Sequence, residues 1–500
     1  MRAAGDEIPG VDGQWRRYQT PAFELFSHLD EQASQQILRR VERLDAIVKE
    51  AFHLEQRRPN PVVIYMFSDE AGFAAHVPDS LRALHRTAGF YLAGPDRSVI
   101  ALSPKWDEAE TRRLIFHEYV HHLSRVAGDD SPLWFSEGIA EFFSSMEEDG
   151  GHLVLGRAID VHVQFLQQHG VMPLAELFAI KSSSPDYHES ERAGQFYAQA
   201  WALLHYWYCG SDDASSAFRE GRDRFVTATR SEGGRADPVA RARLFQACFQ
   251  MNYAQAGAAL ENYVRRGAYA RRRVAIPLET LDSKYGSQPV SRNEIRRRLA
   301  ELDLRVNRSP AGRKVMIEAS VDRPRDVRAI EALGAAALNE GDRAGAQRYW
   351  LDAVAEGTSN PAVYAQLAAL EAQHWFSQLD VGFELPADEA VKLRPLLLEL
   401  IRRAPQQTLG YETLAWVEAT AKTPVIGNIV LVQEHLGSLR PRDRTLLALA
   451  LARIRMNDFV TARALLTAAE QEATAPQAGE WSARLRKFAD EREKAIRVVR

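Results

Sequence analysis

Apolar runs of strand length alternate with a helical pattern near the start of the chain. Residues 22–26, 61–67 and 97–102 are short and rich in apolar and β-branched side chains, as expected for buried strands. Residues 31–52, between the first two runs, have apolar positions at the three- and four-residue spacing of an amphipathic helix. This order of strands and helices predicts an α+β fold for the first part of the chain.

Two apolar helices are predicted directly after these strands. Asp107, followed by Glu110 three residues later, is a capping signal for the start of the first helix. The stretch from Gly128 to Pro132 contains the glycine and proline that commonly separate two helices. The second helix should therefore begin near Leu133.

These two helices carry the residues with the most distinctive chemistry. His117 and His121 are four residues apart, so both imidazoles should lie on one face of the first helix, with Glu118 beside them. Glu137 and Glu141 are one turn apart on the second helix, where a carboxylate among apolar residues needs a partner. This H-E-x-x-H spacing, followed by a glutamate, indicates a zinc site with an adjacent base.

At these positions the chain resembles the gluzincin branch of the zinc peptidases, and more narrowly the bacterial peptidase-MA-like proteins. The resemblance is specific at the two helices, including the stretch from Ser131 to Trp134 before Glu137-Gly138, and it extends loosely over residues 20–270. It implies a zincin-like fold and one Zn²⁺ per chain. It also implies that Glu137 is the third ligand after His117 and His121.

The resemblance and the chemistry of peptide hydrolysis together assign further roles. Glu118 would take a proton from the attacking water and pass it to the leaving amine. Glu141 would orient a ligand imidazole through the ring nitrogen that faces away from the metal. Tyr197, in a helical stretch that resembles a tyrosine-bearing helix of the family, would stabilise the oxyanion, with Tyr206 and His205 as alternatives.

A substrate-binding strand is also expected. In gluzincins the strand before the first zinc helix lies at the sheet edge and holds an extended peptide, which points to Ile100, Ala101 and Leu102. An ordinary covered strand is the alternative. The chain lacks the Gly-x-Met-Glu-Asn motif with which aminopeptidase-N-like enzymes bind a free amine, so an endopeptidase is favoured.

The second half has a different, helical pattern. Small and large residues around Gly334 and Trp350 match a tetratricopeptide helix pair, and part of this pattern returns near Ala462. A plain helical bundle is the alternative. The predicted fold class is an α+β zincin-like metallopeptidase domain followed by an all-α tetratricopeptide-like repeat domain. The predicted parts are residues 1–19 as an N-terminal extension, 20–270 as the metallopeptidase domain (20–105 an α/β substrate-edge lobe, 106–270 a helical zinc lobe), 271–325 as a linker and helix, 326–475 as repeats and 476–500 as a C-terminal helix.

Composition narrows the partners and the compartment. The net charge of −4, from 63 basic and 67 acidic residues, gives no general attraction to nucleic acid. No apolar run approaches the length of a transmembrane helix, and residues 1–7 lack the apolar core of a signal peptide, so the chain as it stands is predicted to be cytoplasmic. The resemblance instead implies relatives that are often exported, and the two expectations remain open.

Two classes of function follow from the sequence. The first is a zinc endopeptidase that acts on a peptide or protein substrate, with helical repeats that bind the substrate or a protein partner. The second is a tetratricopeptide interaction protein whose peptidase-like domain is inactive or latent. Pseudo-enzymes commonly lose the base, whereas Glu118 is present here, which favours the enzyme.

Overall fold

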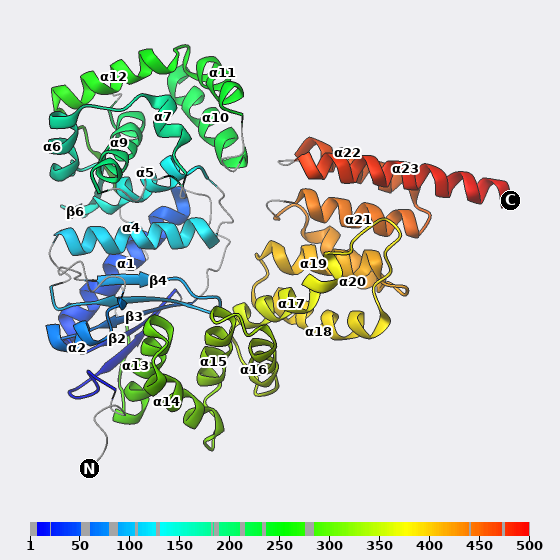
Figure 1. Ribbon diagram of the computed structural model, residues 1–500, viewed down its shortest axis with the longest axis horizontal. Coiled ribbons are helices and arrows are strands. Elements are labelled where there is room, and N and C mark those ends of the chain that lie inside the picture. The colour runs from blue at the N-terminus through cyan, green and yellow to red at the C-terminus, as the bar shows by residue number, and fades with distance from the viewer. Residues whose placement is uncertain are drawn as a thin grey trace.

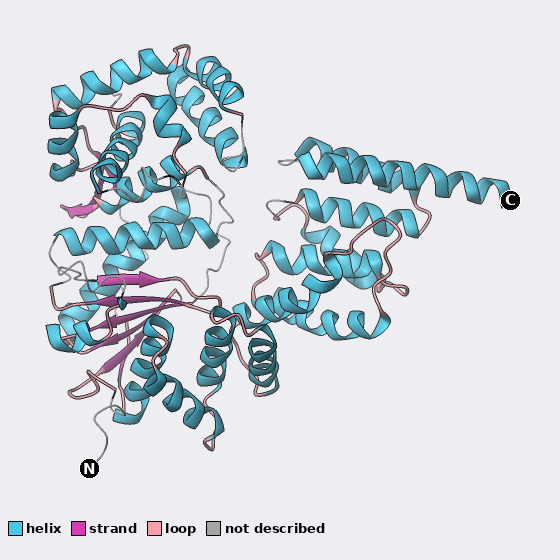
Figure 2. Ribbon diagram, viewed as in Figure 1, coloured by secondary structure: helices cyan, strands magenta, loops and turns pink. Residues whose placement is uncertain are grey.

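The computed structural model describes residues 8–20, 22–51, 61–79, 89–105, 109–126, 131–181, 184, 190–210, 216–232, 237–275, 285–439, 442–472 and 476–499. An α+β half is followed by a predominantly helical half, and Figure 2 shows that the strands belong to the first of these. In Figure 1 the α+β half is a tall stack of layers, and α17 to α23 extend from its side toward the C-terminus.

The central layer is a six-stranded mixed sheet with the order β4-β5-β3-β2-β1-β9. The predicted strands at 22–26, 61–67 and 97–102 are confirmed as β2, β3 and β5, which run parallel to one another. All five residues of β3 and of β5 are buried, as expected for parallel strands covered on both faces. The strands of this sheet are β1 (Arg16–Gln19), β2 (Phe23–Ser27), β3 (Val62–Met66), β4 (Gly89–Leu92), β5 (Ser98–Leu102) and β9 (Ser287–Pro289).

Helices α1 and α4 cover one face of the sheet, and further helices lie above them (Figure 1). Apolar residues of the sheet such as Leu25 and Ile64 share a core with Leu38 of α1 and Val120 of α4. The predicted helix at 31–52 is confirmed as α1, and the second apolar helix begins at Leu133 as expected. The proposed cap at Asp107 lies outside the described residues.

The elements of this layer and of the helices above it are α1 (Glu31–Ala51), α2 (Glu70–Ala75), α4 (Ala109–Val126), α5 (Leu133–Ser144), β6 (Glu147–Asp149), β7 (His152–Leu155), α6 (Asp160–His169), α7 (Leu174–Ala179), α9 (Ser190–Tyr208), α10 (Ser216–Glu232), α11 (Pro238–Phe249), α12 (Tyr253–Arg266) and β8 (Arg272–Ala275). Strands β6, β7 and β8 form a small second sheet.

The opposite face of the sheet is covered by α13, α14 and α15, which follow the predicted metallopeptidase domain in sequence. Phe26 and Tyr65 of the sheet share a core with Leu299 of α13, Met316 of α14 and Leu333 of α15. The predicted extension at residues 1–19 contains β1, and the predicted linker at 271–325 contains β8 and β9, which pair with β7 and β1. Strands β1, β8 and β9 are short and largely polar, so they lack the apolar alternation that marks a strand in sequence.

Polar contacts also join the helical half to the sheet. Arg305 of α13 donates two hydrogen bonds of 2.7 Å to Asp96 in the loop between β4 and β5, and both side chains are nearly inaccessible to water. Arg97 in the same loop pairs with Glu331 of α15. The side chain of Asn360 donates to the backbone oxygen of Asp96 at 2.9 Å.

The remaining helices pack against their neighbours in the sequence, in agreement with the predicted helical region. Gly334 of α15 permits a close approach, because a Cβ atom there would lie 2.4 Å from the indole nitrogen of Trp350. The helices are α13 (Arg292–Asn307), α14 (Pro310–Val321), α15 (Val327–Asn339), α16 (Arg343–Ala355), α17 (Pro361–Phe376), α18 (Ala387–Arg403), α19 (Thr408–Thr420), α20 (Ile426–His435), α21 (Asp443–Arg455), α22 (Phe459–Glu472) and α23 (Pro476–Val499). Within the described residues, no helix is both long and apolar enough to cross a membrane.

Candidate metal centre

Helices α4 and α5 bring His117, His121 and Glu137 to one point. Nε2 of His121 lies 3.1 Å from Nε2 of His117 and 3.1 Å from Oε2 of Glu137. Nε2 of His117 lies 3.2 Å from the same carboxylate oxygen. Within the described part of the chain, these three residues are the one group of histidine, cysteine and acidic side chains arranged to hold a metal ion.

The spacing of the three atoms suits a small divalent cation. Zinc binds histidine nitrogen and carboxylate oxygen at about 2.1 Å, and tetrahedral ligands at that distance are about 3.4 Å apart. The observed separations of 3.1 to 3.2 Å are close to this value. A set of two nitrogens and one oxygen is the ligand chemistry of a catalytic zinc site, which keeps a fourth position open.

The packing of α5 explains why two acids can lie in an apolar helix. Glu137 is 5% exposed and Glu141 is 7% exposed, so both carboxylates face partners inside the protein. Gly138, between them, lies against α9, because a Cβ atom at this position would be 2.7 Å from the backbone oxygen of Ala200. The glycine therefore lets α9 pack closely against α5 and brings Tyr197 toward the centre.

Glu141 lies behind the three candidate ligands and contacts one of them. Its Oε1 lies 3.4 Å from Nδ1 of His117, the ring nitrogen on the side away from the triad. Oγ of Ser136 lies 3.3 Å from the corresponding Nδ1 of His121. Each histidine therefore has a polar group at Nδ1 that favours the tautomer with Nε2 free for a metal.

The charges of the acids perturb the ionisation of the centre. Burial lowers the pKa of His117, but hydrogen bonds and charge from Glu137 and Glu141 outweigh this effect and raise that pKa to about 10. Burial raises the pKa of Glu137, but the hydrogen bonds from His117 and His121 reverse it and lower that pKa to about 2. Without a metal, the His117 ring is therefore protonated on both nitrogens and positively charged at neutral pH. A metal must displace one of these two protons.

An open pocket of about 610 Å³ lies beside the triad and contains the two predicted catalytic residues. Glu118 and Tyr197 both line it, and the ring centre of Tyr197 is 6.3 Å from that of His117. The remaining lining residues are Arg113, Leu114, His117, Glu141, Val161, His162, Phe165 and Gly194.

The two alternatives to Tyr197 lie away from this pocket. His205 is fully buried, with Nε2 2.6 Å from the backbone oxygen of Gly156 and Nδ1 2.7 Å from the hydroxyl of Tyr263. Tyr206 packs against Tyr263 and Phe218. Of the three residues considered for the oxyanion, only Tyr197 lines the pocket.

The expectation that Ile100, Ala101 and Leu102 form a sheet edge is wrong. These residues belong to β5, which pairs with β4 on one side and β3 on the other. The strand at this end of the described sheet is β4, which runs antiparallel to β5. Tyr91 of β4 is tied to α4, because its hydroxyl lies 2.9 Å from Nδ1 of His122.

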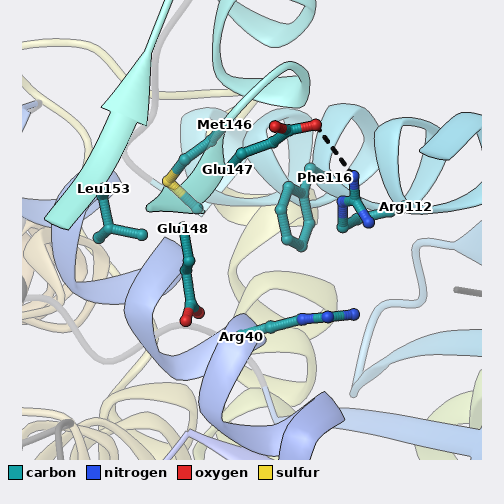
Figure 3. A pocket seen from close by; sticks show the side chains of 7 residues that line it. All are labelled: Arg40, Arg112, Phe116, Met146, Glu147, Glu148 and Leu153. Carbon is teal, nitrogen blue, oxygen red and sulfur yellow. Dashed lines mark hydrogen bonds and ion pairs between the residues drawn. The ribbon is translucent and has the colours of Figure 1, made fainter. Parts of the chain in front are cut away.

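Figure 3 shows a second, smaller pocket of about 280 Å³ near the start of α4. Arg112 of α4 donates to Glu147 of β6 at 3.3 Å across its rim, and Glu148 pairs with Arg43 of α1. Its apolar lining comes from Phe116, Met146 and Leu153. Acidic and basic groups are balanced there, so this pocket has no clear charge preference.

Sequence reasoning missed the residues that surround Glu141. His162 of α6 and Arg113 of α4 both lie within 3.5 Å of its carboxylate. Arg113 lies four residues, or about one helical turn, before His117. This spacing places it on the same helix face and could have predicted its contact with the site. His162 has no such local signal, because it reaches the centre only through the packing of α6 against α9.

Residues 113–220 match the family model described as "Protein of unknown function (DUF1570)". This family is grouped with the peptidase MA-like, or zincin-like, families. The matched segment contains most of α4 and all of α5, α6 and α9, and so includes the three candidate ligands. A comparison with curated proteins finds no match.

Proposed function

We propose that this chain is a zinc-dependent peptidase that cleaves internal peptide bonds. The observation that carries this proposal is the arrangement of His117, His121 and Glu137 around one point, with Glu118 in the adjoining pocket. The match to a peptidase MA-like family over the same helices supports it. A bound zinc ion supplies positive charge that acidifies water and polarises a carbonyl group.

Glu118 acts as the general base in this proposal. It follows the ligand His117 directly, and it lines the pocket without belonging to the triad. It accepts a proton as the water oxygen bonds to the carbonyl carbon of the substrate. It then gives that proton to the amine nitrogen as the carbon–nitrogen bond breaks.

Tyr197 stabilises the charge that develops on the carbonyl oxygen. Its ring lies beside His117, and its phenolic hydroxyl is a hydrogen-bond donor. A donor directed at a developing oxyanion contributes more to the transition state than to the bound substrate. The role therefore predicts an effect on kcat.

Strand β4 replaces β5 as the proposed substrate-binding strand. In the described sheet it pairs with β5 alone, so its other edge offers backbone donors and acceptors to an extended peptide. The link between Tyr91 and His122 holds this strand against α4. Since the chain lacks the amine-binding Gly-x-Met-Glu-Asn motif, the substrate is an internal peptide segment.

We also propose that the helical half binds the substrate or a protein partner. Its paired helices, including the close contact of Gly334 with Trp350, are consistent with a tetratricopeptide-like array that binds a peptide or protein. The same feature supports the alternative of an interaction protein with a latent metal domain. The presence of Glu118 favours the enzyme over this alternative.

The test is cleavage of a diverse peptide pool by zinc-loaded protein, followed by mass spectrometry. Glu118→Gln is the matched variant, since it keeps the three ligands, and Glu261→Gln on the exposed surface of α12 is the control. Wild type and the control should cleave, whereas Glu118→Gln should bind zinc without cleaving. If zinc-loaded wild type leaves the pool intact, the alternative of a latent or interaction protein is favoured.

A further inference from the structure

A third histidine, outside the motif, contacts the acid behind the metal centre. Nε2 of His162 lies 3.3 Å from Oε2 of Glu141, at ion-pair distance. His162 belongs to α6, which packs against α9 and contributes neither a candidate ligand nor the proposed base. Its side chain is 12% exposed, and its ring centre is 5.9 Å from that of Trp201.

The two oxygens of Glu141 have different surroundings. Oε2 is approached by Nε2 of His162 at 3.3 Å, by a guanidinium nitrogen of Arg113 at 3.4 Å and by Oγ of Ser144 at 3.4 Å. Oε1 faces Nδ1 of His117 at 3.4 Å. Oε2 thus accepts from Arg113, with the Ser144 hydroxyl, which donates mainly to the backbone oxygen of Glu141 at 2.7 Å, also near it, and the imidazole of His162 lies at ion-pair distance from it. The other oxygen faces the imidazole of the candidate ligand.

This division has a direct consequence for the geometry of His117. A carboxylate fixed at one oxygen cannot turn its second oxygen away from its partner without breaking the first set of contacts. In the neutral imidazole that a metal requires, the one ring proton is therefore kept on Nδ1, and Nε2 is directed at the other ligand atoms. Arg113 comes from the same helix as His117, whereas His162 contributes the contact from α6.

We propose that His162 is a positioning residue of the metal centre, acting through Glu141 on the orientation of His117. The inference rests on the proposed metal site and deepens it. A side chain that only filled the space beside Trp201 could be replaced by an apolar residue of similar size. The contact with Glu141 instead requires a nitrogen donor at the place of Nε2.

Zinc affinity, measured by competition with a chelator, tests this role without depending on catalysis. The variants are His162→Leu, which keeps bulk but removes the donor, and His162→Gln, whose amide nitrogen can reach the place of Nε2. Loss of an outer contact typically weakens metal binding by about 10- to 100-fold. We expect His162→Leu to lose at least about tenfold and His162→Gln to recover most of it.

A double-mutant cycle separates positioning from a structural role. In the Glu141→Gln background, His162→Leu should cause little further loss of affinity, because the path to His117 is already broken. The visible absorption spectrum of the cobalt-substituted protein should change in His162→Leu and return toward wild type in His162→Gln. Replacement of His152, an exposed histidine of β7, by leucine is the control for removal of a surface histidine.

The outcomes distinguish this inference from the proposed function. An unchanged zinc affinity in His162→Leu, or an equal loss with and without Glu141, would overturn the positioning role. Weakened zinc binding that is rescued by glutamine, in a protein that cleaves no peptide, would support the role and count against the peptidase. A wild type that binds no zinc would overturn both.

Discussion

Zinc binding should release a proton from His117, and its affinity should fall as the pH is lowered. The pKa of this histidine is raised to about 10, because hydrogen bonds and charge from Glu137 and Glu141 outweigh the effect of burial. Zinc requires the neutral imidazole. Because pH 7 is about 3 units below this pKa, removing the proton costs about 4 kcal/mol of the zinc-binding free energy.

A rise in pH should lower the stability of the metal-free fold but raise the affinity for zinc. The ordinary pKa of histidine is 6.5, and a raised folded-state value means that the charged form stabilises the metal-free fold. This contribution is complete below about pH 6.5 and is lost as the pH rises through about 10. Zinc affinity has the opposite trend and rises over the same range.

Two measurements check this prediction. Calorimetric titration of zinc in two buffers with different ionisation enthalpies should show release of at least about one proton per ion near pH 7. Competition with a chelator should show affinity that increases about tenfold per pH unit, or about 100-fold from pH 7 to pH 9. In Glu141→Gln the increase should level off at a lower pH, because one of the two acids is gone. Absence of proton release with a flat affinity would refute the reasoning.

Three further outcomes are expected. Tyr197→Phe should lower kcat by about 10²- to 10³-fold with little change in KM, and an unchanged kcat in steady-state assays would remove Tyr197 from the mechanism. Val161 is 54% exposed where it lines the pocket, so Val161→Asp should reduce cleavage next to apolar side chains in the peptide pool; an unaltered cleavage pattern would show that this wall does not select substrate. Arg305→Met should leave Asp96 with fewer partners and lower the free energy of unfolding by about 3–5 kcal/mol in urea titrations; a loss below about 1 kcal/mol would contradict the importance of this buried pair.

The sequence predicted those features that depend on local spacing. The parallel strands β2, β3 and β5 were visible as short apolar runs, and α1 as a three- to four-residue period. His117 and His121 had to share a face once α4 was helical. Glu137 could be placed near them because it lies on the next helix, and the three side chains do converge.

The features that were missed depend on tertiary pairing. Nothing in the apolar stretch from Ile100 to Leu102 shows which strands will lie on its two sides, and β4 was not predicted as its neighbour. His162 lies 41 residues after His121, the last residue of the motif, and belongs to a different helix. Its contact with Glu141 exists only because α6 packs against α9.

The sheet shares one hydrophobic core with α13, α14 and α15, and this limits how the chain can be divided. Leu333 of α15 packs in the same core as Phe26 and Tyr65 of the sheet, and Asn360 donates to the loop between β4 and β5. A chain that stopped near residue 290 would leave these aromatic rings open to water. Expression of the half with the candidate metal centre alone should therefore yield aggregates, and recombination between genes could exchange this half only together with the helices through α15.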